Sequence, residues 1–485
     1  MARRNGLAVA RLLPVLLGVV VAASPASAQD GCEFGEEGND VLRQVTMTGG
    51  EAIFYVTRPH LVCEGGIQIW ADSAEAFTST NLAHLIGSVR YEDPNRTLVA
   101  DEARYFSQVG RLQAQGGMRI VDRDEGSTIE NGALVYLRQT DFRDEETMTV
   151  TALDDESRPR ATLSDASDAQ PSGEERVYVV VGDRIESRGE DFLRSTGSVD
   201  LLFDSVVAHA DTLEYEESID RVDLRGNAVV NAPEYDLSGA RVELTSPEPG
   251  RRDVRALGEA ELTGEDFVLT AERIFLFASD DRMERLVALP AAIDTASKGA
   301  MGRPAAAPGA ALPAPTAMTG QRPVAVAQSF EITADSLEIL APEERLERVF
   351  AAGRARSVST GRDSLTVESL PDVARSDWLE GDTIVVTFVP KVETVVAAAS
   401  DTVSAGAPSG VDVDRIVAIA SARSLYRLPS SDPTAVAGVD PPAVHYVVGD
   451  RITIVMHDGD VDRMKVVGST TGVHLEPIRP GGGGR

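Results

Sequence analysis

Hydrophobic and polar residues follow one short pattern that recurs along this chain. It reads apolar, any residue, small, acidic, any residue, apolar, any residue, apolar, as in Ile69 to Ala76 and again in Leu98 to Tyr105. Copies centred on residues 72, 101, 132, 183, 211, 240 and 272 are mostly about 28 to 32 residues apart. A repeated spacing of this size indicates a repeat architecture. The acidic position is occupied by Asp72, Asp101, Asp183, Asp211, Asp335, Asp382 and Asp450.

A second pattern falls between the copies of the first and ends in a glycine. Asp220 to Gly226 (DRVDLRG) and Asp462 to Gly468 (DRMKVVG) are two examples. Within both patterns the apolar residues alternate with a period of two, which indicates β-strands with one buried face.

The phase of this alternation changes at the small–acidic pair. Ile332 and Ala334 have one parity, whereas Leu337 and Ile339 have the other. Such a shift would place the apolar side chains of the second half of the strand on the solvent-facing side, unless a bulge or corner compensates for it. A small residue fits the inner side of a corner, and an aspartate can accept hydrogen bonds from the freed backbone N–H groups. Helical periodicity is nearly absent, so the sequence predicts an all-β fold, a solenoid-like or jelly-roll stack of short strands bent at regular corners.

The N-terminus has the composition of an export signal. Arg3, Arg4 and Arg11 accompany a short apolar stretch, residues 12–22, and small residues follow at 26–28. This order is typical of a signal peptide with its cleavage site. The apolar stretch is shorter than the roughly 20 residues that span a bilayer, although an uncleaved anchor is the alternative. We therefore expect residues 1–28 to be removed and the mature chain to lie in the periplasm, with or without association with the outer membrane.

Stretches of different composition interrupt the repeat. Residues 153–176 predict a polar insertion, residues 294–327 a Pro/Ala-rich linker, and residues 476–485 a glycine-rich disordered tail, with a smaller interruption at 398–411. These stretches leave three β regions, 29–152, 177–293 and 328–475.

Charge and cysteine content narrow the choice of partners. The formal net charge of −31 argues against nucleic acid, because neutralising phosphates requires a basic face. Cys32 and Cys63 are the only cysteines. In an oxidising envelope they can pair and close a loop of about 30 residues. Two free thiols are the alternative.

The sequence from Gly87 to Tyr91 (GSVRY), through Leu98 to Asp101 (LVAD), to Leu112 to Gly117 (LQAQGG) resembles the OstA-like family of periplasmic lipopolysaccharide-transport proteins. The segment from Ala210-Asp211 to Gly226-Asn227-Ala228-Val229 is the next best match. The resemblance covers roughly residues 45–290 well and 328–475 loosely.

This resemblance implies a stacked antiparallel β-jelly roll bent into a V, a β-taco, with an apolar groove that shields lipid acyl chains. The implied partners are lipopolysaccharide or a related envelope lipid, and other transport components or further copies of the chain that pair edge to edge. No catalytic residue, metal or cofactor is implied. Candidates for the groove come from both halves of the repeats: Ile67, Ile69, Ala103, Tyr105, Leu213, Tyr215, Ile274, Leu276, Leu337 and Ile339.

Other interpretations remain open. Each groove candidate taken singly also fits an ordinary core position, and the chain could be an envelope scaffold or adaptor without a lipid ligand. Arg221, Arg348 and Arg463 recur in register and could form a phosphate-binding row, or could pair with neighbouring acids. A β-solenoid could also degrade polysaccharide, but the carboxylates occupy repeat positions that a structural role explains, and the histidines lack metal-ligand spacing.

Overall fold

The structure is a computed structural model that describes residues 31–477 apart from 36–38, 48–50, 125, 166–175, 190, 204, 249, 265–266, 280–281, 292–321, 328–329, 343–344, 360–364, 369, 391–410, 432–434, 437–438 and 458–459. Within these residues the fold is all-β and every strand pairing is antiparallel. Short 3₁₀ turns occur at Ser107–Val109, Asp155–Ser157, Glu217–Ile219 and Asp372–Ala374. The predicted signal peptide and nearly all of the predicted tail lie outside the described residues.

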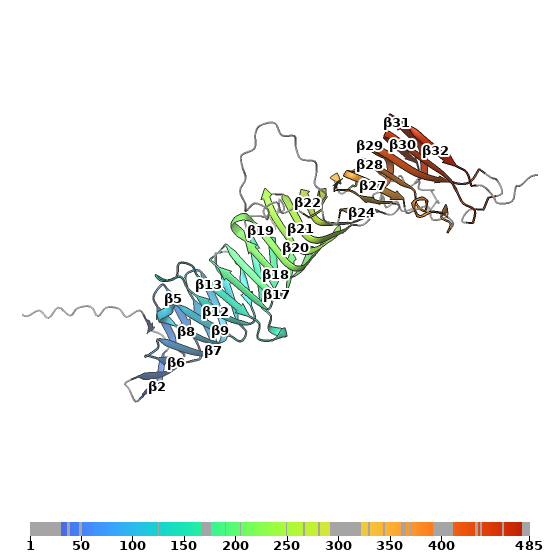
Figure 1. The fold of residues 1–485 in the computed structure, drawn as a ribbon. Helices are drawn as coiled ribbons and strands as arrows, with labels where there is room; N and C mark the ends of the chain where they lie inside the picture. The colour runs from blue at the N-terminus through green and yellow to red at the C-terminus, as the bar shows by residue number, and fades with distance from the viewer. Residues whose placement is uncertain are drawn as a thin grey trace, which may run out of the picture.

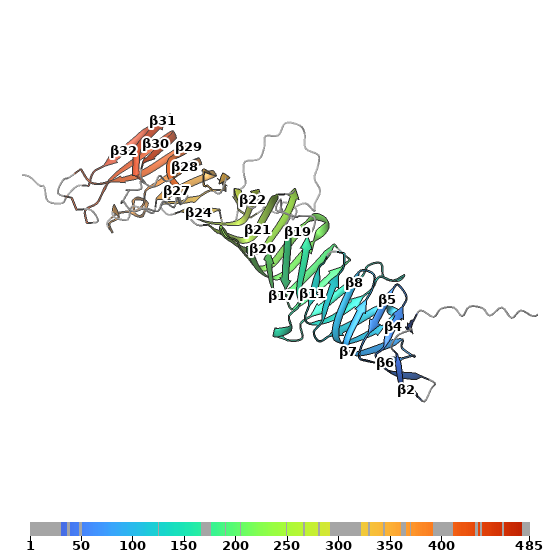
Figure 2. The same ribbon diagram turned by 180° about the vertical axis from the view of Figure 1, so that it is seen from behind.

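The strands form one long ladder in which each level is a bent strand, either continuous or interrupted at the bend. Figure 1 shows the ladder as an elongated stack with β2 near one end and β31 and β32 at the other, and Figure 2 shows it from behind. The continuous bent strands are β7 Leu82–Glu92, β8 Arg96–Phe106, β17 Phe192–Phe203, β18 Val206–Glu216, β19 Arg221–Asn231, β20 Tyr235–Glu248, β21 Arg251–Gly264, β22 Phe267–Ser279, β27 Arg348–Ser359, β28 Trp378–Pro390, β29 Val411–Leu428 and β30 Ala443–His457.

The bend divides the ladder into two arms, because the two halves of each bent strand pair with different neighbours. Leu82 to Ile86 of β7 pair with β6, whereas Arg90 to Glu92 pair with β5. The short strands of the first arm are β2 Asp40–Thr46, β3 Ala52–Thr57, β6 Ser73–Phe77, β9 Arg111–Gln115, β12 Ala133–Leu137, β13 Thr147–Thr151, β16 Arg184–Arg188, β23 Arg282–Leu289, β26 Ser336–Leu340 and β31 Asp460–Val467. Those of the second arm are β1 Cys32–Phe34, β4 His60–Cys63, β5 Ile67–Trp70, β10 Arg119–Asp122, β11 Thr128–Glu130, β14 Arg160–Asp165, β15 Arg176–Val181, β24 Val324–Ala327, β25 Phe330–Thr333 and β32 Thr471–Leu475.

Hairpin turns lie at the far end of each arm, and we call these two lines of turns the first and second rims. The bends form a third line, the corner. One hairpin therefore consists of two levels, which explains why the sequence pattern repeats about every 28 to 32 residues.

The predicted change of parity at the corner is confirmed. Ile332, Ala334, Leu337 and Ile339 are all at most 2% exposed although the two pairs have opposite parity. The neighbouring strand carries a bulge that compensates: in β7 the pairing steps from Ile86 to Val89, while its partner β8 steps only from Glu102 to Ala100. One extra residue on one strand bends the pair and keeps both halves facing inward.

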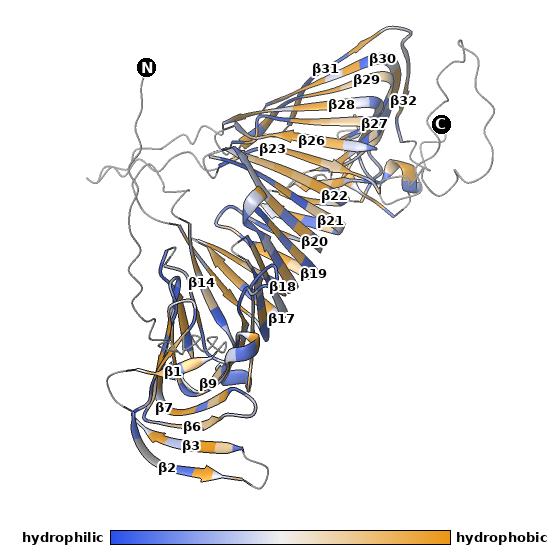
Figure 3. Ribbon diagram, turned by 90° about the vertical axis from the view of Figure 1, so that its left-hand side faces the viewer, coloured by the Kyte–Doolittle hydropathy of each residue, from blue (hydrophilic) through white to orange (hydrophobic). Residues whose placement is uncertain are grey.

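The core lies between the arms and forms one cluster that extends from Leu61 to Ile454. Apolar and polar segments alternate along individual strands in Figure 3, as expected when one face of each arm is buried. A smaller cluster (Val367, Leu370, Ala374, Trp378 and Leu425) forms where residues around 367–374 pack against strands β28 and β29. The ion pair between Arg427 and Asp377, at 2.8 Å, holds this segment in place.

Two of the predicted interruptions are shorter than the sequence indicated. Residues 160–165 of the predicted insertion form strand β14, which pairs with β11 and β15. Residues 324–327 of the predicted linker form strand β24, which pairs with β22 and β25. These segments are polar or rich in Ala and Val, and they become strands because the ladder offers a neighbour to pair with. Since β23 also pairs with β26, the ladder continues across the linker region. Residues 166–175, 292–321 and 391–410 lie outside the described residues.

Candidate functional site

The corner aspartates fit against glycines on the neighbouring strand. Gly226 has φ +78°, and a Cβ added there would lie 2.8 Å from Cβ of Asp211. The aspartate thus occupies the space that a side chain would need, and the positive φ also favours glycine. The two sequence patterns are therefore the two halves of one corner. The pairs are Asp72 with Gly87, Asp101 with Gly116, Asp183 with Gly197, Asp211 with Gly226, Asp335 with Gly353, and Asp450 with Gly468.

Asp382 also lies at a corner, where the register of β28 against β29 shifts between Glu380 and Thr383. Its neighbouring strand carries Ala420 and Ser421 with φ of +60° and +51° in place of a glycine.

The hydrogen bonds of the corner carboxylates differ from the expectation. Within the described residues they accept from side chains: Ser88 Oγ donates to Asp72 at 3.1 Å, and Asn227 Nδ2 donates to Asp211 at 3.2 Å. Arg354 Nη2 donates to Asp335 at 2.7 Å. The expected capping of backbone N–H groups by these carboxylates was wrong for these corners. The aspartate backbone N–H instead donates across the corner, as from Asp72 to the carbonyl of Gly87 at 2.8 Å.

The ten groove candidates are placed mostly in the packed interior. Tyr215 alone among them is half-buried, and the other nine are at most 2% exposed within the main core cluster: Ile67, Ile69, Ala103, Tyr105, Leu213, Ile274, Leu276, Leu337 and Ile339. Their side chains point inward in successive levels, as the shared parity predicted. In this structure they contact one another, so they form a closed core at these levels.

An open apolar space lies instead between the two rims in the middle of the ladder. A first cavity of about 100 Å³ is lined by Leu163 and Tyr178 of the second arm and by Phe192 and Tyr215 of the first. These four side chains are half-buried, which leaves them accessible from the solvent between the rims.

A second cavity of about 40 Å³ shares Tyr178 with the first and continues toward the C-terminus. It is lined by Phe203, Val206, Leu244 and Arg252 among others. The ring of Tyr178 stacks on Phe203 at 4.3 Å between centroids, and Arg252 lies over the Phe203 ring at 4.7 Å. We call these two neighbouring cavities together the rim groove. Its lining is mainly aromatic and aliphatic, with the guanidiniums of Arg96 and Arg252 and a few carboxylates, among them Asp122 and Asp220.

The N-terminal end of the rim groove is bounded by a buried polar cluster. Arg96 and Asp122 line the first cavity and form an ion pair at 3.4 Å. Arg96 Nη1 donates to the hydroxyl of Tyr136 at 2.9 Å, and that hydroxyl donates to Glu146 at 2.8 Å. Arg96 also pairs with Glu146. Burial opposes the charge on Arg96, but the hydrogen bonds that Arg96 donates to Glu146 and Tyr136 and the charges of these two groups together outweigh burial, so the pKa of the guanidinium is raised.

Tyr91 and Asp93 complete this cluster. The hydroxyl of Tyr91 donates to Asp93 at 3.0 Å, and Asp93 accepts from the backbone N–H groups of Asn95 and Arg96 in the turn between β7 and β8. Burial, followed by the charge of Asp93, raises the pKa of Tyr91. We call Tyr91, Asp93, Arg96, Asp122, Tyr136 and Glu146 the rim clamp, because Tyr91, Asp93, Arg96 and Asp122 come from the second rim and Tyr136 and Glu146 from the first.

The arginines of the proposed phosphate row lie next to acids. Arg221 pairs with Glu216, its partner across the strands, at 2.7 Å. Arg348 and Arg463 lie 3.6 and 3.9 Å from the carboxylates of Glu347 and Asp462. The alternative of cross-strand pairs with neighbouring acids is therefore confirmed for Arg221, whereas Arg348 and Arg463 each lie near the acid that precedes them in the chain.

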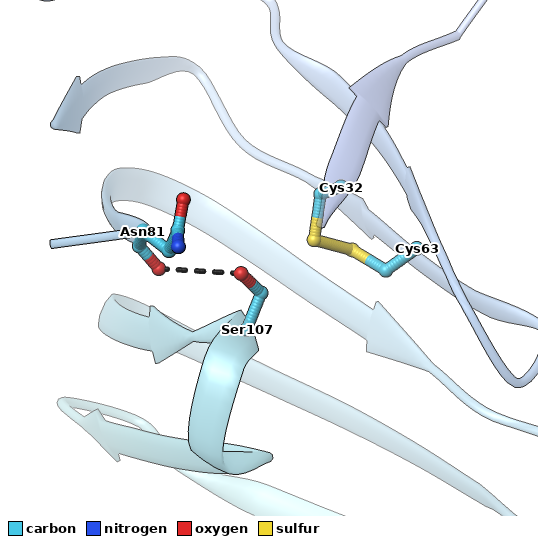
Figure 4. Close-up of a disulfide and its surroundings, with 4 residues drawn as sticks. All are labelled: Cys32, Cys63, Asn81 and Ser107. Atoms are coloured by element: carbon cyan, nitrogen blue, oxygen red, sulfur yellow. Dashed lines mark hydrogen bonds between the residues drawn. A yellow bond between two sulfur atoms is a disulfide. The ribbon is translucent and has the colours of Figure 1, made fainter. Parts of the chain in front are cut away.

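Cys32 and Cys63 form a disulfide, drawn in Figure 4. The two residues are register partners of the adjacent strands β1 and β4. Because β1 has only three residues, the bond attaches the first strand of the second arm to the ladder.

The described residues contain no group of three or more His, Cys, Asp or Glu side chains arranged to hold a metal ion. No helix among them has the length and hydrophobicity needed to cross a bilayer.

Sequence reasoning missed the residues that line the rim groove and the rim clamp, except Tyr215. A signal was present: Phe192 and Phe203 are the first and last residues of β17, and Tyr215 is next to the end of β18. Aromatic residues at strand ends beside turns mark the rims.

Together these features define an all-β protein in which an antiparallel ladder, bent along one corner, holds an apolar groove between its rims. No protein-family model and no curated protein matches the sequence.

Proposed function

We propose that this protein is a non-enzymatic β-taco protein of the OstA-like type that binds acyl chains of lipopolysaccharide or a related envelope lipid in the periplasm. The rim groove is the observation that supports this proposal. It is apolar, lies between the two arms and is reached from the solvent side of the rims.

The physical basis is the burial of hydrocarbon. Transfer of apolar surface out of water stabilises a complex by roughly 25 cal/mol per Å², so an acyl chain that covers Tyr178, Phe203 and Leu244 gains affinity without any chemical step. Arg252 lies at the same site and can contact an anionic group of the ligand. The chain as a whole is strongly acidic, so the local attraction that this proposal uses comes from the guanidinium of Arg252.

The cavities are small, about 100 and 40 Å³, and an acyl chain would have to part the half-buried side chains that line them. In the middle of the ladder the two arms meet through side-chain packing, as where the ring of Tyr178 on the second arm stacks 6.4 Å between centroids from that of Tyr215 on the first. Such contacts can separate at the expense of a rotamer change, whereas backbone pairing within each arm stays intact.

A matched pair of variants tests the groove. Leu163 is half-buried and lines the first cavity, and Val177 lies on the neighbouring strand with 40% of its surface exposed. We expect Leu163→Glu to weaken binding of lipopolysaccharide or of a fluorescent acyl probe at least about tenfold, because it places a charge in the groove. Val177→Glu adds the same charge outside the groove and should leave binding unchanged.

The scaffold hypothesis predicts the opposite result. One continuous packed core favours it, since most of the interior is closed. Purified protein that carries no lipid, binds no acyl probe and responds equally to both variants would overturn the lipid-binding proposal in favour of a scaffold. Localisation is tested separately: N-terminal sequencing of the mature protein should begin at Gln29.

A further inference from the structure

The two arms are tightly packed together at the N-terminal part of the ladder. Strands β5 to β9 hold several large inward-facing side chains that are less than 2% exposed: Ile67, Ile69, Leu85, Tyr91, Leu98 and Leu112. Close-packed side chains leave no room for a ligand between the arms at these levels.

The rim clamp closes the same levels from the outside. Asp93 is 6% exposed and Arg96 is 7% exposed, although both are charged residues near a turn. The hydrogen bond from Arg96 to Tyr136 joins the second rim to the first, and the bond from Tyr136 to Glu146 continues it. Farther along the ladder the rims are separated by half-buried aromatic rings, so the clamp marks the change from a closed to an open interior.

We propose that the rim clamp is the blind end of the rim groove. This inference rests on the proposed function and adds two properties to it. An acyl chain that enters near Tyr178 extends toward Arg96 and stops there, so the groove selects ligands by chain length. The N-terminal end of the ladder does not pass lipid onward, so a ligand enters and leaves through the open middle of the rims.

Two physical reasons make the clamp a barrier to hydrocarbon. Passage beyond Arg96 would break the bonds that join the rims and leave buried charged groups without partners. It would also require displacement of the packed side chains behind the clamp, such as Leu98 and Leu112, which are not exposed. Neither loss is recovered by contact with an acyl chain.

The first experiment measures binding of a series of saturated fatty acids of increasing length to the wild-type protein. Affinity should rise about fourfold for each added methylene and then become constant at a limiting length. A rise that continues through the whole series overturns the blind end, while the proposed function stands if Leu163→Glu still abolishes binding. If no fatty acid binds at all, the proposed function fails and this inference fails with it.

The second experiment locates the end of the chain. A fatty acid with a photoreactive diazirine at its terminal carbon is bound and irradiated, and labelled peptides are identified by mass spectrometry. We expect label on β10, β11 and β14, whose residues Ile120, Ile129 and Leu163 line the first cavity. Label on β4, β5 or β7 overturns the inference. The experiment uses the wild-type protein, so its result does not depend on the folding of a variant.

The third experiment removes the barrier. The double variant Arg96→Met/Glu146→Leu replaces the ion pair that joins the rims with apolar side chains of similar size, so Glu146 is not left buried without Arg96, and Asp122 still accepts a hydrogen bond from the backbone N–H of Asp124. It should shift the limiting chain length upward, and Tyr136→Phe, which removes one hydroxyl, should shift it less. Arg194→Met, on an exposed pair with Glu214, is the matched control and should leave the limit unchanged. An unchanged limit in a folded double variant contradicts the inference.

Discussion

Replacement of Gly226 by alanine tests the corner that underlies the whole ladder. Gly226 has φ +78°, and its hypothetical Cβ would lie 2.8 Å from both Cβ and Cγ of Asp211. The left-handed backbone costs a non-glycine residue about 1–2 kcal/mol. Overpacking against the aspartate adds about 1–3 kcal/mol. We therefore expect Gly226→Ala to destabilise the corner by about 2–5 kcal/mol.

Gly126 provides the matched control, because it has nearly the same φ, +76°, but nothing within 4 Å of the position of its Cβ. Gly126→Ala should lose only the backbone part, about 1–2 kcal/mol. The difference between the two variants isolates the contact with Asp211. In a double-mutant cycle, Asp211→Gly should recover part of the loss in the Gly226→Ala protein, because it removes the clashing atoms.

Native-state hydrogen exchange is the suitable assay, since a long repeat ladder can open locally. Amides of β18 and β19 should exchange about 30 to 4,000 times faster in Gly226→Ala, which corresponds to the ~2–5 kcal/mol above, because each ~1.4 kcal/mol is a factor of ten. If Gly226→Ala costs no more than Gly126→Ala, the pairing of corner aspartate with glycine does not explain the second sequence pattern.

Three further outcomes follow from the same structure. The double variant Cys32→Ser/Cys63→Ser removes a disulfide that closes a loop with a sequence separation of 31, so it should destabilise the N-terminal edge by about 3–4 kcal/mol. Amide exchange should become faster in β1 and β4 and stay unchanged in β30. Asp223 is 1% exposed and accepts hydrogen bonds from Arg225 and Arg241, so Asp223→Ala should lower the free energy of unfolding in urea by about 1–3 kcal/mol. An unchanged free energy of unfolding would contradict a stabilising role for this buried carboxylate. Burial raises the pKa of Tyr91, Tyr105 and Tyr136, so the folded protein keeps these protons at a pH where unfolded tyrosines, with a pKa of ~10, ionise. The stability that these tyrosines contribute is therefore complete below pH ~10 and is lost as the pH rises further. An ultraviolet titration should show the three tyrosines ionising only when the protein unfolds.

The local features of the fold could be predicted because they depend on short-range physics. Period-two alternation requires a strand with one buried face, and the parity change at Ala334-Asp335 requires a corner. Both are properties of a few consecutive residues. The aspartate and the glycine were recognised as separate signals, however, since nothing in the sequence shows that Asp211 lies against Gly226 on the next strand.

The candidate site was less predictable for the same reason. Leu213 and Tyr215 have the same parity and similar hydrophobicity, yet the structure buries Leu213 in the core and leaves Tyr215 at the rim groove. Distance from the corner decides between these positions, and it depends on how many residues each arm contributes at that level. The extents of β14 and β24 were missed because their pairing partners, more than their composition, make them strands.

By itself the sequence determined the all-β class, the corners and the inward-facing residues, because side-chain alternation and backbone geometry act over a few residues. Only the tertiary structure decided which inward-facing residues form closed core and which line an open space. Whether two arms touch depends on side chains that are far apart in sequence, such as Arg96 and Tyr136, or Tyr178 and Tyr215. Contacts of this kind form only when the whole ladder is assembled.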